Sequence, residues 1–158
     1  MSSGRERASP GPAVPEGRSP ADGSEGNRGQ PGETNEIGID IIETVRIKGV
    51  LERHDDRFLR RVYTEWERGY CRRNILHLAG RWAAKEAVSK VLGLGIRGVG
   101  WREIEIKRTP LGQPIVALHG RAEERRRALG LTSPLAVSIS HIRDLAVAVA
   151  VGTRAGPA

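Results

Sequence analysis

The sequence predicts an α+β domain with a largely antiparallel sheet. Strand-like apolar runs occur at 36–42, 101–106, 115–118, 135–140 and 145–151. Residues 109–114 contain two prolines and one glycine, a composition typical of a hairpin loop between two of these runs. The element order βααββαββ leaves few helices between strands, which favours antiparallel pairing over a parallel sheet.

Each predicted helix has its own signal. Residues 44–70 mix apolar positions with many arginines, and residues 75–92 are rich in alanine and are followed by Gly93 and Gly95. A short charged helix is predicted over 121–129, where Gly130 ends it. The sheet is therefore expected to pack with one long helix and one or two shorter ones.

The chain divides into a tail and one domain. Residues 1–36 are rich in Gly, Pro and Ser and lack large apolar side chains, so a disordered N-terminal extension is expected there. The domain is predicted to span residues 37–152, with a short tail over 153–158. Because residues 1–36 carry four arginines and six acidic residues, the formal charge of +7 comes from the domain.

Composition restricts the location and the partners. No apolar run approaches the ~20 residues of a membrane-spanning helix, and the N-terminus has no signal-peptide pattern. The single cysteine, Cys71, suggests a structural thiol, so a cytoplasmic protein without membrane contact is expected. The basic charge suits nucleic acid, acidic proteins or phosphorylated molecules alike. Aromatic residues make up only 4% and no nucleic-acid recognition signature is present, so nucleic acid is not expected as a partner.

Two carboxylates are candidates for chemistry. Asp40 lies in an apolar run that predicts a buried strand, where an ionised acid needs a cation or strong hydrogen bonds, although it could also cap nearby amides. Glu86 lies one helical turn before Lys90, a spacing that by itself favours a simple surface salt bridge over a functional site. Two acids with neighbouring lysines would suit Mg²⁺ completed by phosphate oxygens and water.

Other motifs are less specific. Gly93 and Gly95 could let backbone amides approach a phosphate or could simply end a helix. Ser138 and Ser140 precede His141, but adjacent residues of a strand point to opposite faces, which argues against a Ser/His nucleophile pair. His141 also fits an ordinary turn position. The remaining histidines have no zinc-ligand spacing with Cys71.

Three motifs in the right order resemble the holo-acyl-carrier-protein synthase family of 4'-phosphopantetheinyl transferases. They are Gly38-Ile39-Asp40-Ile41 continuing to Arg46, the helix from Ala79 to Lys90 with the core Trp82-Ala83-Ala84-Lys85-Glu86-Ala87, and Ser138 to His141. Gly112-Gln113-Pro114 before a strand also agrees. The resemblance covers about residues 37–152, and it departs from the family in having Trp82 where phenylalanine is commoner and in its N-terminal tail.

The resemblance implies a reaction and a site. The phosphopantetheine arm of coenzyme A would be transferred to a serine of apo acyl carrier protein, giving the holo carrier and 3',5'-ADP. Asp40 and Glu86 would hold Mg²⁺, Lys90 would contact the phosphates, and His141 would lie beside the nucleotide. Glu86 or a metal-bound water would take the serine proton. Further phosphate contacts are expected from Arg81, Lys85, Gly93 and Gly95.

The resemblance also implies partners. Acyl carrier proteins are acidic, so Arg46 and Arg57 in the early helix are the expected docking residues, although other arginines there could merely be solvated. A single copy of the fold implies a homotrimer with active sites between subunits. Fatty acid biosynthesis is the implied process, while a polyketide carrier stays open. A nucleic-acid-binding module and an inactive trimeric scaffold are the alternatives, and the retention of Asp40, Glu86 and Lys90 argues against the scaffold.

Overall fold

Three antiparallel strands form the main sheet, in the order β1-β5-β4. They are β1 (Thr34–Glu43), β5 (Leu145–Arg154) and β4 (Ala136–His141). A second sheet is the antiparallel hairpin of β2 (Ile104–Arg108) and β3 (Pro114–Leu118). The computed structural model describes residues 34–93 and 95–154. Every strand pair in these ranges is antiparallel, which confirms the predicted α+β class.

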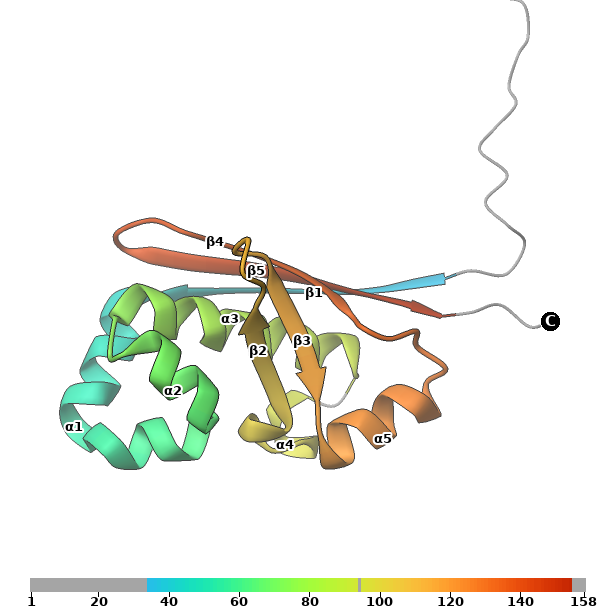
Figure 1. Cartoon of the computed structure of the whole chain (residues 1–158), viewed down its shortest axis with the longest axis horizontal. Helices are drawn as coiled ribbons and strands as arrows, with labels where there is room; N and C mark the ends of the chain where they lie inside the picture. The colour runs from blue at the N-terminus through green and yellow to red at the C-terminus, as the bar shows by residue number, and fades with distance from the viewer. Residues whose placement is uncertain (1–33, 94, 155–158) are drawn as a thin grey trace, which may run out of the picture.

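The helices lie together on one side of the main sheet. In Figure 1 this sheet runs along the upper side, seen edge-on, and the helices lie below it. They are α1 (Thr44–Val62), α2 (Glu65–Cys71), α3 (Ile75–Val91), α4 (Gly95–Gly98) and α5 (Gly120–Ala128). Both α1 and α3 are long, whereas one long helix was predicted. Within the described ranges, no helix has the length and apolar character needed to cross a membrane.

Helix α3 forms the centre of the core. Its small residues Ala79, Ala83, Ala84 and Ala87 are completely buried, so the helix can approach the sheet closely. The closest approach is at Gly38 in β1, where an added Cβ would lie 2.0 Å from the carbonyl oxygen of Ala87. Only glycine fits where β1 crosses α3. This close contact determines which face of β1 packs against α3.

Two predicted element boundaries are corrected. The strand expected at 101–106 starts only at Ile104, because residues 101–103 form a 3₁₀ turn in which the Gly100 N–H donates to the Glu103 carboxylate. The helix expected at 44–70 is two helices, since Thr64 caps α2 through a hydrogen bond from the Glu67 N–H.

The domain is also longer than predicted at both ends. Ladder pairing joins Thr34 to Arg154, so Thr34–Glu36 and Thr153–Arg154 belong to the sheet. An ion pair of 2.6 Å between Glu36 and Arg154 supports this end of the ladder. Residues 1–33 and 155–158, where the remainder of the two predicted tails falls, lie outside the described residues.

Candidate active site

Asp40 lies on the inner face of β1, between the sheet and α3. Its carboxylate Oδ1 is 2.9 Å from the Lys90 ammonium, which also donates to the Ile39 carbonyl at 2.6 Å. The Asp40 side chain is 19% exposed and that of Lys90 48%. The expected fully buried strand is wrong, because Ile37, Ile39 and Ile41 point outward and are 67%, 59% and 61% exposed. Asp40, on the opposite face, is at a site that solvent can reach because 19% of its side chain is exposed.

Glu86 faces Asp40 from α3. Burial raises the pKa of the Glu86 carboxyl above its ordinary value and the charge of Asp40 raises it further, while Lys90 and a hydrogen bond from Ser89 oppose this shift. Among the described residues, Lys90 forms its ion pair with Asp40 and not with Glu86, so the simple i,i+4 salt bridge is not formed. Two carboxylates that repel each other beside a single lysine favour binding of a further cation.

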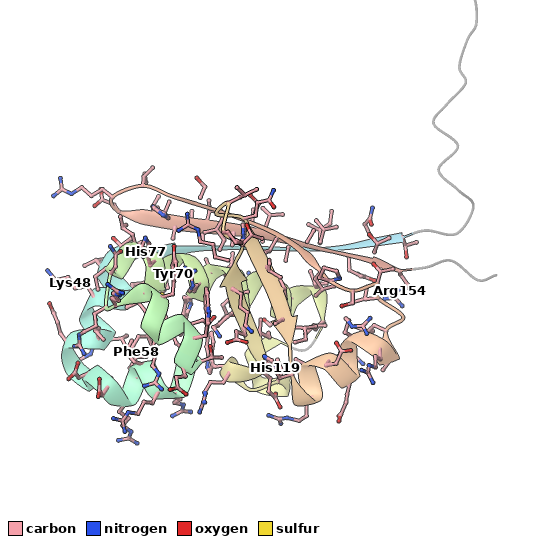
Figure 2. All side chains as sticks on the ribbon, in the orientation of Figure 1. Lys48, Phe58, Tyr70, His77, His119 and Arg154 are labelled. Atoms are coloured by element: carbon pink, nitrogen blue, oxygen red, sulfur yellow. The ribbon has the colours of Figure 1, made fainter. Side chains whose placement is uncertain are left out.

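A cationic hollow of about 300 Å³ lies at the other end of α3. Arg81 is 7% exposed, and its guanidinium carbon lies 4.1 Å from the centre of the Tyr70 ring. His77 stacks on Tyr70 at 5.3 Å, and His141 lies 6.5 Å from His77 between ring centres. Figure 2 shows Tyr70 and His77 side by side, from α2 and α3. The structure thus brings the predicted residues Arg81 and His141 together.

The hollow also contains unsatisfied donors and further positive charge. Lys107 and Arg108 of β2 complete its basic lining. Arg81 Nε and His77 Nδ1 have no hydrogen-bond partner among the described residues. Burial lowers the pKa of His77, as do the charges of Arg81, His141 and Arg108. A buried guanidinium with a free N–H, flanked by other cations, is suited to binding a phosphate group.

Lys85 does not reach either site. It is completely buried, and its ammonium lies 2.8 Å from the Glu67 carboxylate, donates to the Trp101 carbonyl at 2.9 Å and also donates to the carbonyl of Ile104. Burial lowers the pKa of Lys85, and the Glu67 charge opposes this. The expected phosphate contact of Lys85 is therefore wrong, because all three donors of the ammonium are used inside the protein.

Gly93 and Gly95 lie beyond the end of α3, away from the cationic hollow. Both have positive φ, +71° and +56°, and the Gly93 N–H donates to the Lys90 carbonyl at 3.0 Å. At a rise of about 1.5 Å per residue, Gly93 lies roughly 18 Å along the helix axis from Arg81. The glycine turn is thus next to Lys90, and the adjacent Leu92 carbonyl accepts a hydrogen bond from Arg125.

The basic helix α1 has a kink. Asp55 has φ 41° and ψ −126°, which divides the helix into two segments. Arg46 precedes the kink and Arg57 follows it, and both side chains are exposed. Around the kink, a hollow of about 290 Å³ is lined by His54, Arg57, Phe58 and Arg61. The two predicted docking residues therefore lie on one helix but on different segments of it.

Sequence reasoning missed several of these residues. Tyr70, His77, Lys107 and Arg108 were not predicted in the hollow. His77 lies four residues before Arg81 on α3, and this helical spacing was the available signal. The buried partner Glu67 also had a local signal, because Thr64-x-x-Glu67 is a capping-box pattern.

An α+β fold with two facing carboxylates, a lysine and a cationic hollow suits an enzyme that transfers a phosphorylated group. Residues 36–150 match the family described as the 4'-phosphopantetheinyl transferase superfamily. The chain is 50% identical over 116 residues to a holo-[acyl-carrier-protein] synthase of Gloeobacter violaceus, which covers 71% of this chain and 87% of that protein. The holo-[acyl-carrier-protein] synthase of Herpetosiphon aurantiacus is 45% identical over 122 residues and covers 73% and 95%.

Solved structures agree with these relatives. The Helicobacter pylori holo-[acyl-carrier-protein] synthase in complex with coenzyme A has a TM-score of 0.67 and 34% identity, covering 73% of this chain and 98% of that one. The Plasmodium yoelii acyl carrier protein synthase with ADP bound has a TM-score of 0.71 and 26% identity, covering 78% and 98%. The chain therefore belongs to the 4'-phosphopantetheinyl transferase superfamily, as an enzyme of its holo-[acyl-carrier-protein] synthase branch.

Proposed function

We propose that this enzyme transfers 4'-phosphopantetheine from coenzyme A to a serine of an apo acyl carrier protein, in a Mg²⁺-dependent reaction in the cytoplasm. The products are the holo carrier and 3',5'-ADP, and the pathway served is fatty acid biosynthesis. The observation that carries this proposal is the pair of carboxylates, Asp40 and Glu86, that face each other beside Lys90.

The residues present fit a magnesium ion. Asp40 and Glu86 supply carboxylate oxygens from two rigid elements, and the raised pKa of Glu86 reflects the cost of holding two negative charges together. Mg²⁺ commonly takes one or two carboxylates and completes its shell with water and substrate phosphates. When bound, it would neutralise charge on the pyrophosphate of coenzyme A and so support phosphoryl transfer.

The side chains have separable roles in the transfer. Lys90 moves from its ion pair with Asp40 to the phosphate oxygens and stabilises the charge that develops there. Glu86 accepts the proton of the serine hydroxyl on a carboxylate oxygen. The serine oxygen forms a bond to the β-phosphorus, the bond from this phosphorus to the bridging oxygen breaks, and 3',5'-ADP leaves with that oxygen.

The cationic hollow is proposed as the site for the phosphorylated nucleotide end of coenzyme A. Arg81 supplies the free Nε–H, and His141 lines the same hollow. The rings of Tyr70 and His77 offer an adjacent aromatic surface. Backbone amides at Gly93 and Gly95 would contact phosphate only at the Lys90 end of the site, because these glycines lie beyond that end of α3.

Carrier docking is proposed on α1, through Arg46 and Arg57. Exposed guanidinium groups on one helix complement an acidic partner and speed its association. Charge reversal of either residue is expected to raise KM for the carrier without changing KM for coenzyme A.

A homotrimer is proposed from the bare face of the main sheet. Ile37, Ile39 and Ile41 point outward, opposite Val151, Val149 and Val147 of β5. Figure 1 shows that the helices leave this face of the sheet uncovered. A continuous apolar patch on a sheet face is a common protein interface. Asp40 and Lys90 lie on the opposite face of β1, against α3, so contact through the isoleucine face leaves the carboxylate pair within each subunit's own fold.

The test is intact mass spectrometry of apo acyl carrier proteins incubated with the enzyme, coenzyme A and Mg²⁺. Transfer adds one phosphopantetheine to the carrier, about 340 Da from the composition of the group, and EDTA abolishes the gain. Carriers from fatty acid and polyketide synthesis are compared in parallel. Asp40→Asn serves as the folded, inactive control. No gain with any carrier would contradict the proposal and favour a binding scaffold.

A further inference from the structure

The kink in α1 places two acids within an otherwise basic surface. Asp55 and Asp56 lie at the kink, directly between His54 and Arg57, which line the hollow of about 290 Å³. Both carboxylates are well exposed, 63% and 62%. An acidic partner that approaches this segment of α1 would meet these negative charges together with the arginines.

Arg73 pairs with both acids from a different element. One guanidinium nitrogen pairs with Asp55, and the other lies 3.5 Å from the Asp56 carboxylate. Arg60, one turn further along α1, pairs with Asp56 at 3.3 Å. Asp55 therefore depends on Arg73 alone for its ion pair within the described residues, whereas Asp56 has two cationic partners.

The loop that carries Arg73 is held in an unusual backbone conformation. Arg72 and Arg73 both have positive φ, 45° and 66°, a conformation that residues other than glycine adopt only where the surroundings enforce it. On the C-terminal side, the Asn74 side chain caps α3 by accepting from the His77 N–H at 3.1 Å. On the N-terminal side, the Arg72 N–H donates to the Arg68 carbonyl at 3.1 Å. The fold thus directs Arg73 toward α1.

The ion pairs of Arg73 are too exposed to contribute much to stability. The Arg73 side chain is 53% exposed, and exposed pairs of this kind are weak because water and salt screen them. Their charge nevertheless matters to an approaching partner, since charges at the edge of an interface set the association rate and its salt dependence.

We propose that Arg73 is a positioning residue for carrier docking, which neutralises Asp55 and Asp56 so that the second segment of α1 meets the carrier through its arginines alone. This inference rests on the proposed function. It assigns a role in carrier recognition to a residue of the α2–α3 loop that itself lies outside the docking helix.

The experiment compares four variants with the wild type in the transfer assay, with carrier affinity measured separately by anisotropy of a labelled apo carrier. Arg73→Ala is expected to raise KM and Kd for the carrier about two- to fivefold at low salt, the range typical of exposed charge pairs. The difference shrinks as salt is added. Both kcat and KM for coenzyme A stay unchanged. Arg73→Lys retains much of the affinity, and the triple variant R73A/D55N/D56N restores it.

Arg127→Ala is the matched control. Arg127 is also exposed and also pairs with a carboxylate, Glu123 at 2.8 Å, but it lies on α5 (Figure 1). The Arg127→Ala variant removes the same charge and should leave KM and Kd for the carrier unchanged. An Arg73→Ala variant with unaltered carrier affinity, or one whose KM for coenzyme A rises instead, would overturn the inference, as would failure of the triple variant to recover. A wild type that transfers nothing would instead reject the proposed function itself.

Discussion

Replacement of Lys85 by methionine tests the buried ion pair at the centre of the fold. Lys85 and Glu67 are both completely buried, with 2.8 Å between ammonium and carboxylate. Glu67 also accepts hydrogen bonds from the Thr64 N–H at 2.8 Å and the Ile106 N–H at 2.9 Å. The pair therefore joins α2, α3 and β2. Loss of the lysine leaves a buried carboxylate without its cation and leaves the carbonyls of Trp101 and Ile104 without their donor.

The expected loss of stability is large. Removal of one partner of a buried pair typically costs about 3–5 kcal/mol of unfolding free energy. For a domain of this size, that corresponds to a fall in Tm of roughly 10–20 °C. Urea unfolding and a thermal melt, both followed by circular dichroism at one fixed protein concentration, measure the change. The concentration is fixed because assembly of subunits would otherwise shift the Tm.

Two controls separate the causes. Lys48→Met removes a surface pair of 3.9 Å whose side chains are 64% and 65% exposed, and it should change stability by less than about 0.5 kcal/mol. The double variant K85M/E67Q removes the buried negative charge and should lose less stability than K85M alone. If K85M lost less than about 1 kcal/mol of unfolding free energy and showed a raised KM for coenzyme A, the reasoning would be refuted. Lys85 would then be assigned a contact with phosphate, as the sequence suggested.

Three further predictions concern the surface, the thiol and the metal site. Ile39→Asp should convert trimers to monomers in sedimentation velocity, while Leu111→Asp, at a 92% exposed residue outside the main sheet, should not; trimers that persist in Ile39→Asp would contradict the proposed interface. Burial raises the pKa of Cys71 to about 11, so the thiol of the folded protein should resist a thiol reagent at pH 8. The folded state keeps this thiol neutral, and the protein should therefore lose stability as the pH rises from the ordinary pKa of a thiol toward 11. Below that ordinary pKa the full stability is present. Burial and the charge of Asp40 raise the pKa of Glu86, so the ionised carboxylate destabilises the folded protein at neutral pH. Glu86→Gln should therefore raise the Tm in EDTA, and it should abolish the rise in Tm that Mg²⁺ gives the wild type. The opposite pattern would exclude Glu86 from the metal site.

Local signals in the sequence were sufficient for most elements. The alanine-rich stretch and its closing glycines predicted a helix over 75–92, and α3 spans Ile75–Val91. The Pro/Gly loop predicted the hairpin of β2 and β3, although not the 3₁₀ turn before it. Such features depend on neighbours within a few residues, which is the range that a sequence pattern can report.

The faces of β1 were beyond that range. Every residue of 37–42 is apolar apart from Gly38 and Asp40, so the pattern predicted burial on both sides. The structure covers only the face with Gly38, Asp40 and Ile42, because α3 packs there and no described element covers the isoleucine face. Which face is covered depends on an element nearly fifty residues away, and the strand's own sequence does not contain that information.

The sequence by itself determined the fold class, the family resemblance and the two carboxylates, since these follow from local periodicity and from motifs of adjacent residues. Tertiary structure alone decided that Lys90 pairs with Asp40, that Lys85 is used inside the core, and that Arg73 reaches the acids of α1. Each of these ion pairs joins residues 17 or more positions apart. The partner of a charge is set by how the elements pack, because a long side chain reaches whichever opposite charge the fold brings within a few ångströms.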